Sequence, residues 1–112
     1  MQLMTASSHT APQLKLDLAT DMVSMPAAKG YCSTKASHGV EWGRWYFVAE
    51  VLTGAVRVGW GQALAELQAP VGYDEFSYGI SNKHAALMHC CRRIDCEGLC
   101  FPAAPYTIGC LI

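Results

Sequence analysis

The sequence is poor in charge and has no long uninterrupted apolar run. Only 15% of the 112 residues are charged and the formal net charge is -1, so no basic surface indicates binding to nucleic acid or an anionic membrane. The apolar stretch from Leu99 to Ile112 is too short to span a bilayer, and Pro102 and Pro105 interrupt it. The chain start lacks the basic and apolar regions of a secretory signal. We therefore expect a soluble intracellular protein.

The motifs that catalysis needs are also missing from the sequence. No Gly-rich phosphate loop follows a strand-like segment, and no pair of carboxylates is arranged for acid and base catalysis. Cys32 lies near His38 in the sequence, but nothing supplies an orienting third group or an oxyanion site. We therefore expect no enzymatic activity, no cofactor and no small-molecule substrate.

Cysteine, by contrast, is present but very unevenly placed. Cys32 stands alone, whereas the other five crowd the last quarter of the chain: Cys90, Cys91, Cys96, Cys100 and Cys110. A secreted disulfide framework would distribute its cysteines through the fold. With His84 and His89 nearby, the cluster raises the question of zinc, which needs four convergent ligands, but no CxxC pair is present. Chance composition is our preferred interpretation, and a small zinc-binding module remains an alternative.

Strand-like segments dominate the first part of the chain. Trp45–Leu52 is rich in aromatic and β-branched residues and too short for a typical helix. Thr53-Gly54 follows, and Ala55–Gly61 resumes the strand pattern, which predicts a tight hairpin. The first of these strands is apolar on both faces, as an inner strand of a sandwich would be. Shorter strands are predicted over Gln13–Leu18 and Tyr31–Ala36.

The most distinctive stretch runs from Arg57 to Tyr78. Gly59 lies inside a strand pattern, where glycine usually marks a bulge or the close approach of another backbone. Pro70 and Gly72 lie close together, so Leu67–Tyr73 predicts a shaped loop rather than a ladder strand.

The sequence pattern changes near Ile80. Residues 81–112 lose the alternation and gain cysteine, and Ala85–Arg93 could form a short helix. We therefore expect three regions: a disordered N-terminus over residues 1–10, a domain over residues 11–80, and an irregular or short-helical Cys-rich tail over residues 81–112. The tail is not expected to continue the preceding sheet.

Several short blocks carry a resemblance to a known family. In chain order they are KGY at 29–31, ASHGV at 36–40, WYF at 45–47, RVGW at 57–60, LQAPVGYD at 67–74 and FSY at 76–78. Together they resemble the first half of a SPRY domain, specifically that of the Ash-two-like subunits of COMPASS/MLL-type histone methyltransferase complexes. The likeness covers about Ala11 to Gly79, and the ASHGV, RVGW and LQAP-GYD blocks in this order are its specific part.

The resemblance implies an all-β fold, namely a partial SPRY-type antiparallel β-sandwich, and a non-catalytic scaffolding or regulatory role. In that family the SPRY domain binds an acidic segment of a WD40 β-propeller subunit. Together they activate the SET-domain methyltransferase that modifies lysine 4 of the histone tail, so the resemblance also implies a nuclear location. The family's partner-binding positions correspond here to Tyr31, Arg57, Pro70 and Tyr73.

The chain departs from the family pattern just after the FSY block. A Trp-Arg pair is expected there, and this sequence has Ile80-Ser81, which removes one charge-assisted contact to an acidic peptide. The resemblance ends at Gly79, so we expect a truncated fragment whose tail lies outside the family pattern. A non-functional remnant without a retained partner is therefore a second alternative.

Overall fold

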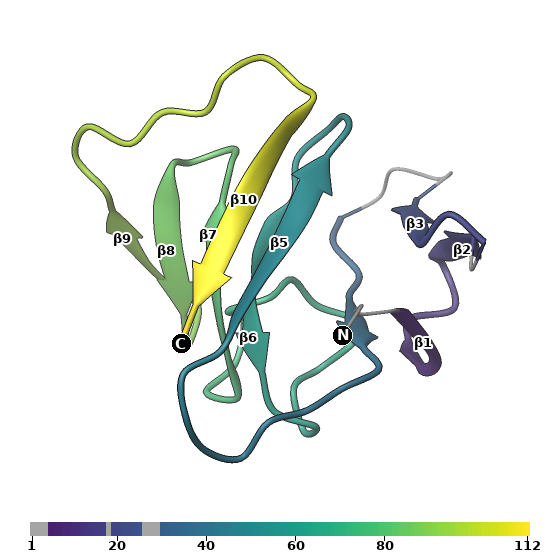
Figure 1. The fold of residues 1–112 in the computed structure, drawn as a ribbon. Helices are drawn as coiled ribbons and strands as arrows, with labels where there is room; N and C mark the ends of the chain where they lie inside the picture. The colour runs from purple at the N-terminus through teal and green to yellow at the C-terminus, as the bar shows by residue number, and fades with distance from the viewer. Residues whose placement is uncertain (1–4, 18, 26–29) are drawn as a thin grey trace. The chain divides into compact units, whose positions relative to one another are not determined.

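The computed structural model describes residues 5–17, 19–25 and 30–112. All regular elements in these ranges are strands (Figure 1), which confirms the expected all-β class. They are β1 (Thr5–Thr10), β2 (Lys15–Asp17), β3 (Met22–Ser24), β4 (Thr34–Ala36), β5 (Tyr46–Val51), β6 (Arg57–Gly61), β7 (Ser77–Ser81), β8 (Ala86–His89), β9 (Arg92–Asp95) and β10 (Tyr106–Leu111). Within the same ranges, no helix has the length and apolar character needed to cross a membrane.

The chain divides into two compact units. The N-terminal unit comprises Met1–Gly43 and Glu66–Pro70, and the C-terminal unit comprises Arg44–Ala65 and Val71–Ile112. In the N-terminal unit β1 pairs with β4, and β2 pairs with β3, both antiparallel. Strand β1 therefore lies within the segment for which we expected disorder.

Both short strands predicted in the N-terminal unit form over fewer residues than expected. The strand predicted over Gln13–Leu18 is β2, and its last residue, Leu18, lies outside the described part of the chain. The strand predicted over Tyr31–Ala36 is reduced to β4. Lys29 of the KGY block also lies outside the described residues.

The turn after β2 is organised by the carboxylate of Asp17. Its Oδ1 accepts hydrogen bonds from the backbone N–H groups of Ala19 at 3.0 Å and Thr20 at 3.4 Å. A hydrogen bond from the Thr20 side chain is the largest cause that lowers the pKa of Asp17, and these backbone bonds add to it. An Asp that bonds the backbone two residues ahead is a common turn former, which explains the tight connection to β3.

The C-terminal unit contains two antiparallel sheets. One has the strand order β6-β7-β8-β9, and the other consists of β5 and β10 (Figure 1). The hairpin predicted from Trp45–Leu52 and Ala55–Gly61 is therefore wrong, because the two strands exist but belong to different sheets. Phe47 of β5 instead packs edge-on against Trp60 of β6, with ring centroids 5.1 Å apart and an interplanar angle of 77°. This edge-to-face contact between two aromatic rings favours packing between sheets over pairing within one.

The last quarter of the chain also belongs to the C-terminal unit. The prediction of a short helix over Ala85–Arg93 is wrong, because β8 and β9 form a hairpin there with Leu87 opposite Ile94. On β8 buried and exposed residues alternate, which is the two-residue period of a strand and not the period of a helix. Strand β10 then pairs along its whole length with β5. The expected end of the sheet at residue 80 thus falls inside β7.

Small residues line one face of the four-stranded sheet. Ser77, Gly79 and Ser81 point to this face of β7, and all three are buried. Their size lets the segment after Pro70 lie directly on the sheet: a Cβ on Gly79 would collide with the side chain of Val71. We call this the small-residue face of the sheet.

Gly59 confirms the close backbone approach predicted from the sequence. A Cβ at this position of β6 would overlap the carbonyl oxygen of Tyr78 on the neighbouring strand. Any side chain here would have to push β6 away from β7, so only glycine permits the observed spacing.

Candidate partner-binding site

Two of the four predicted site residues, Tyr31 and Pro70, lie in the N-terminal unit. Both are half-buried. Ser33, two residues after Tyr31, donates its backbone N–H to Leu67 O at 2.8 Å and its hydroxyl to Ala69 O at 2.5 Å. Because Ala69 precedes Pro70 directly, the structure brings together the two chain segments that carry these site residues.

A pair of amides joins the same loop to a third segment of the N-terminal unit. Gln13 Nε2 donates to Gln68 Oε1 at 2.6 Å, and Gln68 Nε2 donates back to Gln13 Oε1 at 3.0 Å. The backbone N–H of Gln68 also donates to the carboxylate of Glu66 at 2.9 Å. The loop predicted over Leu67–Tyr73 is therefore shaped by side-chain hydrogen bonds on the side that leads to Pro70.

The other two predicted site residues, Arg57 and Tyr73, lie in the C-terminal unit. Arg57 begins β6 and is half-buried, directly opposite Ser81 of β7. This register places it on the small-residue face, the face against which Val71 packs. Tyr73 follows in the same chain segment and is 50% exposed. The structure thus places Arg57 on this face and Tyr73 two residues after Val71, which packs against it.

The loop that carries Tyr73 is held from both sides by backbone hydrogen bonds. Cys91 N–H donates to Gly72 O and Cys90 N–H donates to Asp74 O, each at 3.2 Å. Gly72 in turn donates its own N–H to Ser77 Oγ at 2.7 Å. These bonds fix the backbone around Tyr73, so its exposed ring projects from an ordered support.

That all four site residues line one surface stays a prediction. The segments of Tyr31 and Pro70 meet in one unit, and Arg57 and Tyr73 both belong to the other. Ser33 was missed by sequence reasoning, although its buried hydroxyl holds the Tyr31 segment to the loop before Pro70. A lone serine between Cys32 and Thr34 gives no pattern from which such a long-range bond could be inferred.

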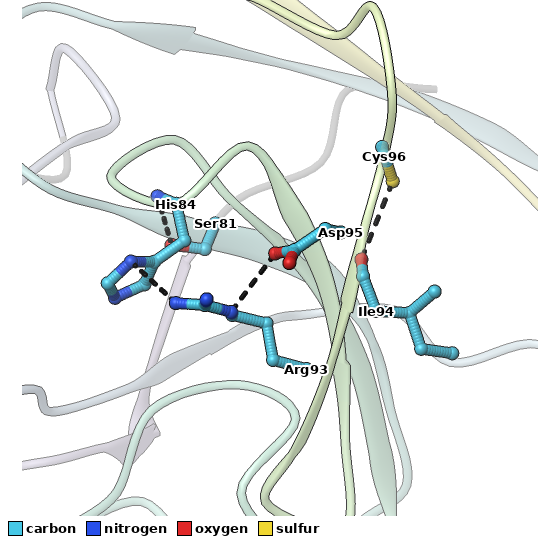
Figure 2. Close-up of polar contacts among 6 residues, drawn as sticks. All are labelled: Ser81, His84, Arg93, Ile94, Asp95 and Cys96. Carbon is cyan, nitrogen blue, oxygen red and sulfur yellow. Dashed lines mark hydrogen bonds and ion pairs between the residues drawn. The ribbon is translucent and has the colours of Figure 1, made fainter.

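Charged groups on the far strand of the four-stranded sheet pair with each other (Figure 2). Arg93 Nε lies 3.0 Å from Asp95 Oδ1, and Arg93 Nη1 donates to His84 Nδ1 at 3.3 Å. Both partners of the ion pair are largely exposed, so its contribution to stability is about 0–1 kcal/mol. The pair lies on β9, which is at the opposite edge of the sheet from β6 and Arg57.

The potential zinc ligands of the tail do not converge. Among the residues that the structure describes, no three His, Cys, Asp or Glu side chains lie close enough together to hold a metal ion. His84 accepts from Arg93, and His89 donates its Nδ1–H to Ser77 O at 2.8 Å while its ring stacks on Tyr78 with centroids 3.9 Å apart. The two histidines are therefore engaged in contacts within the sheet.

The thiols of the tail differ in their surroundings. Cys90, Cys91 and Cys100 are exposed, whereas Cys96 and Cys110 are partly covered. Cys110 stands opposite Phe47 on the face of β10 that carries the buried Ile108. Burial there raises the pKa of the Cys110 thiol above its usual value of 9.0, which favours the neutral thiol.

No protein-family model matches the chain, but individual proteins align with it. The Drosophila melanogaster protein named "Set1/Ash2 histone methyltransferase complex subunit ASH2" is 41% identical over 80 residues, which are 68% of this chain and 14% of the relative. The Caenorhabditis elegans subunit ash-2 of the same complex is 43% identical over 70 residues, 59% of this chain and 12% of the relative.

Over these residues the chain is homologous to ASH2 subunits. The ASH2 homology confirms the resemblance to Ash-two-like subunits that the short sequence blocks indicated. The chain spans only 14% and 12% of the length of these two relatives, so the homology concerns a small part of an ASH2 subunit.

Proposed function

We propose that the chain is a non-catalytic scaffold or regulatory subunit of a histone methyltransferase complex that modifies lysine 4 of the histone tail. The observation that carries this proposal is the ASH2 homology, because the names of both relatives place them in Set1/Ash2 histone methyltransferase complexes. On the same ground we propose a nuclear location. The WD40 β-propeller subunit and the SET-domain methyltransferase are the partners that the family resemblance suggests.

The proposed binding mode is insertion of an acidic peptide segment of the WD40 subunit against Arg57. A guanidinium bonded to a carboxylate is roughly twice as strong a contact as a neutral hydrogen bond. Tyr31, Pro70 and Tyr73 would add aromatic and apolar surface that fixes the register of the peptide. The exposure of Tyr73 on a hydrogen-bonded loop supports this role, since an anchored aromatic loses little freedom on binding.

The decisive experiment is calorimetric titration of the purified chain with a Glu-rich peptide and with its Gln-substituted counterpart. We expect saturable binding of the acidic peptide alone, with weaker binding at higher salt. Arg57→Ala should weaken it by roughly tenfold or more, since a hydrogen bond to a charged group is worth about 1.5–3 kcal/mol. Arg92→Ala, which removes an exposed arginine of β9, is the matched control and should bind like the unsubstituted chain.

Two results would contradict the proposal. Unchanged peptide affinity in a folded Arg57→Ala chain would show that Arg57 does not contact the peptide. No saturable binding by an unsubstituted chain that melts cooperatively would instead favour the alternative of a remnant without a retained partner.

A further inference from the structure

The turn between β8 and β9 presents two adjacent thiols. His89 and Arg92 face each other in the hairpin register, so Cys90 and Cys91 alone form the connecting loop. Both cysteines are exposed, and neither is in a disulfide. The tip of this hairpin is therefore a solvent-facing pair of soft nucleophiles.

The backbone of this turn does not favour cysteine. The φ angles of Cys90 and Cys91 are 50° and 59°, and a two-residue hairpin loop with positive φ at both positions is of type I′, for which Asn-Gly is strongly preferred. Residues with a Cβ other than Asn, Asp or His seldom adopt such angles. Local structure alone therefore gives no reason for two cysteines here, and a conformational outlier of this kind points to a role of the side chains.

The two thiols are better suited to share an external atom than to bond to each other. Consecutive Cα atoms are about 3.8 Å apart across a trans peptide, which is below the range of roughly 4.4–6.8 Å found in unstrained disulfides. A ring that contains one further atom between the two sulfurs relieves this restriction. Thiolate sulfur prefers soft, polarisable centres.

We propose that Cys90 and Cys91 form a bidentate site for one soft thiophilic centre, of the class represented by trivalent organoarsenicals. In the reaction with an arsine oxide, two arsenic–sulfur bonds form and the arsenic–oxygen double bond breaks. The protons of both thiols leave with that oxygen as water. Arsenic remains trivalent, so the step consumes no oxidant or reductant.

Occupation of this site would act on the loop that carries Tyr73. The backbone N–H groups of Cys91 and Cys90 donate to Gly72 O and Asp74 O, which flank Tyr73 on either side. Closing a ring through the two sulfurs constrains the torsions of both cysteines, and therefore the direction of these two N–H groups. We expect altered hydrogen exchange at both amides. The inference does not depend on the proposed binding of an acidic peptide.

The test is titration of the reduced full-length chain with phenylarsine oxide, followed by a wash with excess monothiol and intact-mass analysis. We expect one retained arsenical per chain, released by a small dithiol and mapped to the peptide that contains Cys90 and Cys91. Cys90→Ser and Cys91→Ser should each reduce retention by roughly 100-fold or more, because the second sulfur acts at high effective concentration. The double variant Cys96→Ser/Cys100→Ser is the control and should retain the arsenical fully.

Three outcomes would overturn the proposal. They are retention by Cys90→Ser equal to that of the unsubstituted chain, loss of retention in the Cys96→Ser/Cys100→Ser control, and mapping of the arsenical to another peptide. Since the mapping is done on the unsubstituted chain, it decides the question even if a serine variant fails to fold.

Discussion

Arg57 on β6 lies directly opposite Ser81 on β7, and Ser81 is 0% exposed. The family pattern has its second arginine in the Trp-Arg pair that Ile80-Ser81 replaces here. At this position the sheet accommodates only a small side chain, because Ser81 is fully buried between Arg57 of β6 and Ala86 of β8. The chain therefore carries one arginine at this point of the sheet, not two.

Ser81→Arg should destabilise the chain rather than restore the family's second contact. The new guanidinium would be buried opposite Arg57, and an uncompensated buried charge costs roughly 3–5 kcal/mol. A urea unfolding curve would measure the loss, with Ser81→Ala as the control. The control removes only a long hydrogen bond from His84 N to Ser81 Oγ at 3.4 Å and should cost no more than about 1 kcal/mol. Equal midpoints for the two variants would contradict this account of Ser81.

Gly72→Ala should destabilise the chain much more than Gly54→Ala does. Both glycines have positive φ, 87° and 86°, so each substitution costs about 1–2 kcal/mol of backbone strain. A Cβ on Gly72 would also overlap the backbone of Met88, whereas none of the described atoms lies within 4 Å of one on Gly54. We expect an additional loss of about 1–3 kcal/mol in Gly72→Ala from this overlap. Thermal melts of the two variants test the difference, and similar melting temperatures would refute it.

Phe47→Ala should weaken the packing between the two sheets of the C-terminal unit and lower the free energy of unfolding. The edge-on contact of Phe47 with Trp60 joins β5 to β6, and the half-buried ring should contribute about 2–3 kcal/mol, somewhat less than a fully buried one. Val48→Ala on the opposite face of β5, where Val48 is 58% exposed, should change stability by less than about 0.5 kcal/mol. Denaturant unfolding followed by tryptophan fluorescence would show the contrast. A larger effect of Val48→Ala would mean that the other face of β5 carries the packing.

Cys110 should make the folded chain sensitive to alkaline pH. Because its folded pKa is raised above 9.0 by burial, its contribution to stability is fully present below pH 9.0 and is lost as the pH rises through the folded pKa. The difference in unfolding free energy between the unsubstituted chain and Cys110→Ala should therefore shrink above pH 9.0. Urea unfolding at pH 7.5 and at pH 10 measures it. A difference that stays constant across that interval would show that the thiol titrates normally.

Sequence patterns located several features of the fold correctly. Aromatic and β-branched residues identified β5, and Gly59 marked the close approach of β6 to Tyr78. The loop expected over Leu67–Tyr73 forms as a shaped connection held by side-chain hydrogen bonds. These features depend on local backbone preferences and on the alternation of side chains along a strand. Both involve only a few neighbouring residues and can therefore be recognised in the sequence.

The candidate site could be placed only in part. The residue identities of Arg57 and Tyr73 came from the family blocks. The position of Arg57 on the small-residue face depends on the register of β6 with β7, and the course of the segment that leads to Tyr73 depends on Val71 packing at Gly79. The engagement of His84 and His89 within the sheet was equally hidden, because their partners Arg93, Ser77 and Tyr78 are nine or more positions away. No local pattern encodes such contacts.

The sequence by itself determined the all-β class, the kinship with ASH2 subunits and the segments that become β5 and β6. Only the tertiary structure decided which strands pair, placing β5 beside β10 and not beside β6, and turning residues expected to be irregular or helical into β8, β9 and β10. The physical reason is that strand formation follows local chain preferences, whereas strand pairing depends on hydrogen bonds and buried contacts with distant residues, such as Phe47 against Trp60.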